Sequence, residues 1–360
     1  MMSRKVGKVV EIRKKNENLD DLKVEINGEI QRAYNYPKMT GEVNLGDEVL
    51  LNTTAVELSL GTGGFHYVIS NLNNKECDLE DNGHIMKLRY TPMQVNVDSV
   101  EDHESKYHDV FEKFESLEGM HVAVGTLHSM LTPFAASYKR RNPDKKLVYI
   151  MTDGAALPLY FSLNAASLKE KELIDSTITI GNAFGGDYEC INIYTALITA
   201  KAIADADAVF ISMGPGIAGT GTKYGFTGIE QGPILDAISK LGGVPVAIPR
   251  ISFADTRERH RGISHHSMTV LNEIVNVKTD VAVACYGGEK ENIVRKQITD
   301  SKMDEKHNVV FMGNITTEED LNHYGLKVRS MGRNYEQDSE FFDSASTAAI
   351  YISEKQRENK

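Results

Sequence analysis

Residues 244–266, VPVAIPRISFADTRERHRGISHH, join a short apolar run to a loop rich in arginine and histidine. The run Val244–Ile248 predicts a buried strand, and the segment after the loop, Ser267–Val275, predicts a helix. A loop that leads from a strand into a helix lies at the carboxyl edge of a parallel sheet, where open α/β folds bind their ligands. This stretch therefore indicates the fold class and the place where a functional site should lie.

The same alternation of strands and helices runs from His121 towards the end of the chain. Helices are predicted between the strands, for example over Asn192–Ala204 and Ile229–Leu241, and a last helix is predicted over Glu340–Ser353. Continuous apolar strands separated by helices predict a doubly wound, mostly parallel α/β sheet covered on both faces. We expect a Rossmann-like domain over residues 121–360. The predicted strands are His121–Val124, Leu147–Met151, Thr177–Ile180, Ala208–Ser212, Val244–Ile248, Val281–Ala284 and Val309–Met312.

Residues 1–96 show a different pattern, in which short strands are separated by turns. Asn27-Gly28 is typical of a two-residue hairpin turn, because both residues tolerate positive φ. The pattern predicts a small β barrel or sandwich. Its predicted strands are Val6–Ile12, Leu22–Ile26, Gln31–Tyr34, Glu48–Leu51 and Phe65–Ser70.

Three further segments show other patterns. Ile85–Val97 alternates apolar and polar residues, which predicts one strand that is bent at Pro92. The apolar stripe of Val100–Leu117 has a spacing near 3.6, which predicts a connecting helix within residues 97–120. The glycine run Leu60–His66 fits either a ligand loop or a flexible turn between two strands.

Composition narrows the class of protein. The formal net charge of −11 disfavours broad nucleic-acid binding, which depends on lysine and arginine. No run approaches the ~18 apolar residues of a membrane span, and the N-terminal MMSRKVGK lacks the apolar region of a signal peptide. Cys77, Cys190 and Cys285 lie far apart, without metal-type spacing. We therefore expect a cytoplasmic protein, with a homodimer as the commonest assembly.

Five predicted strands are followed by loops with more glycine, threonine, histidine and aspartate than a turn requires. In a parallel sheet all five loops lie at the same edge, which predicts a ligand site there. The loops are Gly125–Ser129, Thr152–Pro158, Gly181–Glu189, Gly214–Lys223 and Ser252–His266.

The loop Gly214–Lys223 is predicted to bind an anion through exposed backbone amides, hydroxyls and an ammonium group. It matches GxGxxG formally but lacks a ribose-binding acid, and it does not match the phosphate loop GxxxxGK[ST]. A glycine-rich lid without a ligand is the alternative. The candidate ligand-binding residues here are Gly214, Gly216, Gly219, Thr220, Gly221, Thr222 and Lys223.

The arginine and histidine loop supplies the candidates for chemistry. Arg257 and Arg261 would clamp a phosphate or carboxylate, because guanidinium donors match planar oxyanions. His265 or His260 would act as acid or base. Either Asp255 or Asp187 would orient the imidazole. The alternative for the charged residues of this loop is that they form surface ion pairs.

For the other candidate site residues a purely structural role is the alternative. Asp187 suits the N-cap of the following helix, and Asp153 suits a turn and cap. His128 is a candidate ligand-binding residue that could equally be a hydrogen-bonded structural group. His265 and His266 are adjacent, so on a regular helix they point about 100° apart and are not expected to share a metal ion. The sequence assigns no metal ligands and identifies no cofactor.

The chain resembles an uncharacterised bacterial family that is catalogued as a domain of unknown function. The resemblance covers nearly the whole chain and rests on three segments: Leu88–Gln94 (LRYTPMQ), Gly214–Thr222 (GPGIAGTGT) and Arg259–His266 (RHRGISHH). It implies no activity, ligand or catalytic residue.

Three hypotheses follow from these residues. The first is a hydrolase or transferase that acts on a small phosphorylated or nucleotide-like metabolite. The second is a metabolite sensor or scaffold without catalysis, in which the N-terminal domain binds a protein partner. The third is a metal-dependent hydrolase that uses Asp153, Asp187 and a histidine.

Overall fold

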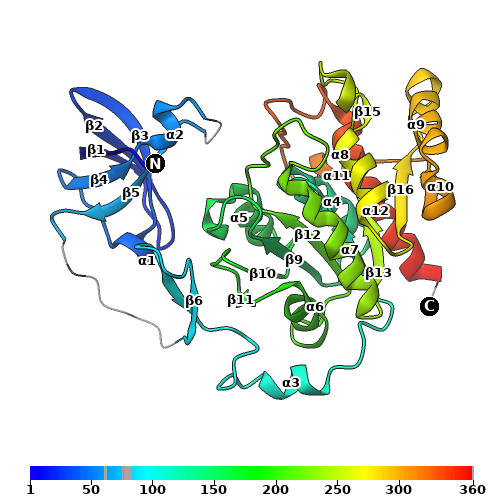
Figure 1. Ribbon diagram of the computed structural model, residues 1–360, viewed down its shortest axis with the longest axis horizontal. Helices are drawn as coiled ribbons and strands as arrows, with labels where there is room; N and C mark the ends of the chain where they lie inside the picture. Colours follow the sequence, from blue (N-terminus) through cyan, green and yellow to red (C-terminus); the bar gives the residue numbers. More distant parts are fainter. Residues whose placement is uncertain (61–62, 75, 77–82, 359–360) are drawn as a thin grey trace. The chain divides into compact units, whose positions relative to one another are not determined.

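The computed structural model describes residues 1–60, 63–74, 76 and 83–358, and the chain forms two units, Met1–Val97 and Asp98–Lys360 (Figure 1). Gly61 and Thr62 of the predicted glycine turn lie outside the described residues, as does Cys77. None of the described helices is long and apolar enough to cross a bilayer.

The N-terminal unit is a closed barrel with the strand order β1-β2-β3-β5-β4. Its interior is aliphatic and includes Leu22, Val24 and Leu51, none of which is exposed. Asn27 and Gly28 have φ values of 52° and 83°, so they form the predicted hairpin turn between β2 and β3. The strands are β1 (Arg4–Lys14), β2 (Asp20–Ile26), β3 (Glu29–Asn35), β4 (Glu48–Asn52) and β5 (His66–Asn71), with short helices α1 (Pro37–Thr40) and α2 (Thr54–Glu57) between them.

The single strand expected over Ile85–Val97 was wrong. The segment forms a hairpin of two short strands, β6 (Ile85–Lys87) and β7 (Val95–Val97), which pair antiparallel. Leu88 and Tyr90 between them have φ values of 52° and 61°. Left-handed backbone of this kind ends a strand, so the alternation of apolar residues continues across a reversal of the chain.

The C-terminal unit is built on an eight-stranded parallel sheet with the order β11-β10-β9-β12-β8-β13-β16-β17 (Figure 1). The central strands are buried along their whole length, as continuous apolar runs predict. The strands are β8 (His121–Val124), β9 (Leu147–Thr152), β10 (Ser176–Thr179), β11 (Tyr188–Glu189), β12 (Ala208–Met213), β13 (Val244–Ala247), β16 (Asp280–Ala284) and β17 (Asn308–Met312).

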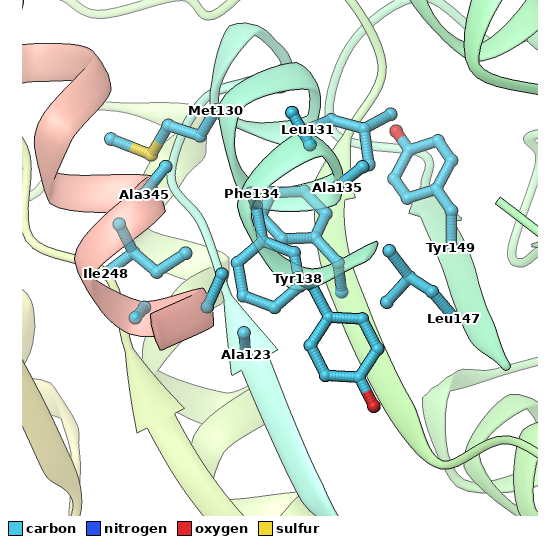
Figure 2. Packing of buried hydrophobic residues seen from close by; sticks show 14 of the residues in the cluster. Ala123, Met130, Leu131, Phe134, Ala135, Tyr138, Leu147, Tyr149, Ile248 and Ala345 are labelled. Carbon is cyan, nitrogen blue, oxygen red and sulfur yellow. The ribbon is translucent and has the colours of Figure 1, made fainter. Parts of the chain in front are cut away.

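Helices cover both faces of this sheet, which confirms the predicted α/β fold. Alternate residues of each strand join two separate apolar layers: Tyr149 packs in one, and Val148 and Ile150 pack in the other. Figure 2 shows the first layer, where Phe134 and Tyr138 of α4 lie with Ala345 of α12. The helices that pack in the first layer are α4 (Leu131–Arg141), α5 (Leu163–Glu170), α11 (Thr317–His323) and α12 (Ser339–Glu358). Those that pack in the second layer are α6 (Ile193–Ala202), α7 (Gln231–Lys240), α9 (Gly288–Asp300) and α10 (Met303–Lys306).

The connecting helix expected over Val100–Leu117 was wrong in extent, because only α3 (His108–Lys113) is helical. The segment before α3 forms successive turns, and the Val100 amide donates to the Glu189 carbonyl at 2.9 Å. The apolar stripe still packs against the second layer, through Val100, Phe111 and Leu117 among others. Burial of the stripe therefore does not require a continuous helix.

Candidate functional site

The strand order determines where loops of the sheet meet. From β8 the chain moves to β9 and β10 on one side, whereas from β13 it moves to β16 and β17 on the other. β8 and β13 are neighbours in the sheet. The chain therefore leaves the carboxyl ends of two adjacent strands in opposite directions. Open parallel sheets bind ligands at such a point, so a ligand site is expected at the loops after β8 and β13.

Three histidines come together after β13. The ligand nitrogen atoms of His260, His265 and His266 all lie within 4.8 Å of one another. The ring centroids are 4.8 Å apart for His260 and His265, 5.2 Å for His260 and His266, and 4.1 Å for His265 and His266. His265 and His266, which were not expected to share a metal ion, both lie close to the ring of His260. Both rings lie in the first turn of α8 (His265–Thr269), where they remain close in spite of their different directions.

Local structure explains how His260 reaches the other two rings. The two-residue strands β14 (Ile251–Ser252) and β15 (Gly262–Ile263) pair antiparallel, so the loop between them, which contains His260, reverses the chain. Ser264 then caps α8, which begins two residues earlier than predicted and so includes both histidines. The Ser264 hydroxyl also lies 2.7 Å from Nδ1 of His260. One serine therefore holds the helix end and the third imidazole together.

The surroundings lower the pKa of all three imidazoles. Burial lowers the pKa of His260 to about 3, with further lowering by Arg250 and Arg257. Burial also lowers the pKa of His266 to about 4, helped by His265 and Arg250, and the ring of His266 stacks on Phe226 at 3.9 Å. The pKa of His265 is lowered in the same direction by burial and then by Arg259. Neutral imidazoles offer lone pairs rather than charge.

Asp255 does not orient a histidine. Its carboxylate accepts hydrogen bonds from Arg257 Nε at 2.9 Å, Arg257 Nη2 at 2.8 Å and Arg250 Nη2 at 2.9 Å. The hydrogen bonds from Arg257 are the main cause that holds the pKa of Asp255 well below its usual range. Arg257, predicted as a free anion clamp, therefore already binds a carboxylate. We call Arg250, Arg257, Arg259 and Asp255 the arginine cluster.

The glycine loop after β12 lies against the histidine loop. A Cβ atom built on Gly219 would lie 3.6 Å from His266 Cε1, and one built on Gly221 would lie 3.8 Å from Arg259 Nη2. Gly214 packs against the loop after β9, where a Cβ atom would lie 2.3 Å from the Ala156 carbonyl oxygen. Gly216, with a φ of 114°, has open space around it. The structure thus brings two of the predicted loops together at the histidines.

The polar side chains of the glycine loop have partners of their own. Thr220 and Thr222 share a hydrogen bond of 2.9 Å between their hydroxyls. Lys223 forms a salt bridge of 2.7 Å with Glu273. The backbone amides of Ala218 and Thr220 are also used within this segment, where they donate to Thr227 Oγ1 and the Gly225 carbonyl.

The remaining predicted residues lie apart from the histidine contacts. Asp187 does not cap the next helix, because Asn192 caps α6 and Asp187 accepts from the Thr177 amide at 2.7 Å. Asp153 accepts from the Asn182 amide at 2.9 Å. His128 is buried, with Tyr149 Oη at 3.0 Å from one nitrogen and Ser162 Oγ at 2.7 Å from the other. Arg261 lies 5.5 Å from the Phe253 ring and lines a separate cavity of about 370 Å³.

Sequence reasoning missed several polar side chains at this edge. Gln231 donates from Nε2 to the carbonyl oxygens of Val124 and Ile248, at 2.7 and 3.1 Å, and so bridges the ends of β8 and β13. Twelve buried side-chain N or O atoms have no hydrogen-bond partner among the described residues, and four of them belong to this region: Thr126 Oγ1, Gln231 Oε1, Arg250 Nη1 and His265 Nε2. Thr126 lies in the predicted loop Gly125–Ser129 but was not named as a candidate. No local pattern marks Gln231, because only pairing of the strands brings it to this edge.

Glu230 was also missed, since it falls in a segment that was predicted simply as helix. It lies in the 3-10 helix η3 (Thr227–Glu230), and its Oε1 accepts from Thr152 Oγ1 at 2.5 Å. Burial raises the pKa of Glu230 to about 7, against the hydrogen bond from Thr152 and helped by the charge of Asp153. This carboxyl group titrates near neutral pH at the end of β9.

Comparison with known proteins places the chain in a family. A family model described as "Protein of unknown function (DUF3866)" matches residues 32–349 of the 360-residue chain. No curated protein and no solved structure matches it. The matched region contains both the histidine loop and the glycine loop. The chain therefore belongs to the DUF3866 family.

Proposed function

We propose that the loops after β8, β12 and β13 bind a small anionic metabolite, phosphorylated or nucleotide-like, and that the protein is a hydrolase or transferase acting on it. The observation that carries this proposal is the guanidinium of Arg250, which is buried and whose Nη1 has no partner among the described residues. A buried neutral donor without a partner costs about 1–3 kcal/mol, and a charged one costs more. An oxygen atom of a phosphate or carboxylate would satisfy it.

The charge balance of the arginine cluster supports an anionic ligand. Three guanidinium groups surround the imidazoles, and the one carboxylate of the cluster, Asp255, is shared by Arg250 and Arg257. Arg259 is exposed and forms no ion pair within the described ranges. The cluster keeps an excess of positive charge in a chain whose formal net charge is −11, which favours capture of an anion.

The histidines are less suited to the acid and base roles first expected of them. A pKa of about 3 makes His260 a weak general base near neutral pH. The version of the metal hypothesis that used Asp153 and Asp187 is not supported either, because both carboxylates accept hydrogen bonds from backbone amides elsewhere. Binding by the arginines is the better supported part of the proposal.

Ligand binding is tested by thermal unfolding and calorimetry of the full chain with inorganic phosphate, sugar phosphates and nucleotides. A ligand at 100 times its Kd stabilises the folded protein by about 2.7 kcal/mol. Arg259→Ala should raise Kd about tenfold to 100-fold, since a hydrogen bond to a charged group contributes about 1.5–3 kcal/mol. Arg261→Ala, which removes an arginine of the same loop that lines another cavity, is the control and should leave Kd unchanged.

Equal loss of affinity in both variants, or no binding by any compound, would remove the anion site. Compounds that bind are then assayed for release or transfer of phosphate. Binding without turnover would favour the sensor hypothesis. The homodimer, the protein partner of the N-terminal barrel and the cytoplasmic location stay predictions.

A further inference from the structure

The histidine cluster has the composition of an open metal site. In protein zinc sites each imidazole nitrogen lies about 2.0–2.1 Å from the ion. Tetrahedral geometry then separates the nitrogen atoms of two ligands by about 3.4 Å. The ligand nitrogens of His260, His265 and His266 already lie within 4.8 Å of one another. Small rotations of the side chains would bring them to that spacing.

We propose that His260, His265 and His266 bind one divalent transition-metal ion of the zinc type, with a ligand position left for a further molecule. Imidazole suits zinc, copper, iron and nickel rather than magnesium or calcium. Three histidines with an open fourth position form one of the known catalytic zinc arrangements. Different side chains hold the metal ion and the proposed anion, so the two proposals can be tested separately.

Two features of the histidine cluster favour a bound ligand. The Nε2 atom of His265 is buried and has no hydrogen-bond partner in the described part of the chain. At His260, Nδ1 lies 2.7 Å from Ser264 Oγ. When Nδ1 donates to that hydroxyl, Nε2 keeps its lone pair, which is the usual way that a second residue orients a metal-binding histidine.

The arginine cluster sets a condition on metal binding. Arg250, Arg257 and Arg259 repel a divalent cation, and the histidines themselves bring no negative charge. An anion or hydroxide at the open position would compensate. Metal and anion should therefore bind more tightly together than separately, and the effect of each on the other must be equal.

The site is tested with the full chain after removal of metals by a chelator. Co²⁺ is the probe, because its visible absorption reports tetrahedral coordination, and Zn²⁺ should displace it. We expect one Co²⁺ per chain. Replacing a second-shell residue of a metal site costs about 10–100-fold in affinity, so loss of a ligand in His265→Ala or His260→Ala should weaken binding at least about 100-fold. His323→Ala, in which an exposed histidine of α11 is lost, is the matched control and should bind as the parent does.

His265→Asn keeps a polar side chain at the helix end and guards against a folding defect, which circular dichroism would detect. Failure of the parent chain to bind Co²⁺, with or without phosphate, would overturn the metal site. Binding of Co²⁺ by His265→Asn and His260→Ala as tightly as by the parent chain would also overturn it. Phosphate binding that persists in the metal-free protein and is lost in Arg259→Ala would leave the anion proposal standing on its own. Co²⁺ binding without any anion effect would support the metal site and remove the linkage.

Discussion

Replacement of Glu230 by glutamine should remove one loss of stability that occurs in the parent chain as the pH rises from 5 to 8. The carboxyl group accepts a hydrogen bond from Thr152 and packs against Gly154, where a Cβ atom would lie 2.7 Å from Glu230 Oε2. Burial raises the pKa of Glu230 from 4.5 to about 7. The folded state therefore holds this proton more tightly than the unfolded state does. Glutamine has nearly the same shape and cannot titrate.

The sign and size of the effect follow from the two pKa values. Below pH 4.5 both states are protonated and the contribution is fully present, whereas it is lost as the pH rises to about 7. At about 1.4 kcal/mol for each pH unit, the whole loss is about 3 kcal/mol. Between pH 5 and pH 8 the free energy of unfolding should fall by about 2–3 kcal/mol more in the parent chain than in Glu230→Gln.

Urea unfolding of the full chain at several pH values, followed by circular dichroism, measures this difference in the C-terminal unit, which we call the sheet unit. Glu319→Gln, in which an exposed carboxylate of α11 is lost, controls for the change in net charge. Parallel pH profiles for the parent chain and Glu230→Gln would refute the reasoning, because they would mean that Glu230 has the same proton affinity in both states.

Three further substitutions test the packing and the arginine cluster. Phe134→Ala removes a fully buried ring that lies 5.0 Å from the ring of Phe210, and it should cost about 3–5 kcal/mol in urea unfolding of the sheet unit. Asp255→Ala leaves the buried guanidinium of Arg250 without its carboxylate and should cost about 3–5 kcal/mol; an unchanged unfolding midpoint would show that the ion pair does not stabilise the fold. Gly28→Ala places a Cβ atom at a φ of 83° and should cost the barrel about 1–2 kcal/mol, measured as the shift of its unfolding midpoint.

Periodicity and turn chemistry were enough to predict much of the fold. The apolar run of β12 predicted a buried parallel strand, and Asn27-Gly28 predicted the turn between β2 and β3, because both signals depend on neighbouring residues alone. The same reasoning failed over Ile85–Val97 and Val100–Leu117. Over Val100–Leu117 the apolar stripe is buried or half-buried although only α3 is helical, so this burial does not require one continuous helix. Over Ile85–Val97 the chain reverses, and Met86 and Tyr90 are exposed whereas Lys87 is buried. Spacing alone therefore did not determine the backbone of either segment.

The candidate site also has features that the sequence predicts and features that only the structure reveals. The sequence by itself determined that loops rich in glycine, arginine and histidine follow strands of one parallel sheet. Only the tertiary structure decided their partners: Asp255 binds Arg250 and Arg257, and Lys223 binds Glu273. The pairing of β14 with β15 brings His260 to His265 and His266. A side chain's partner depends on which distant segments the sheet brings together, and no local pattern of residues carries that information.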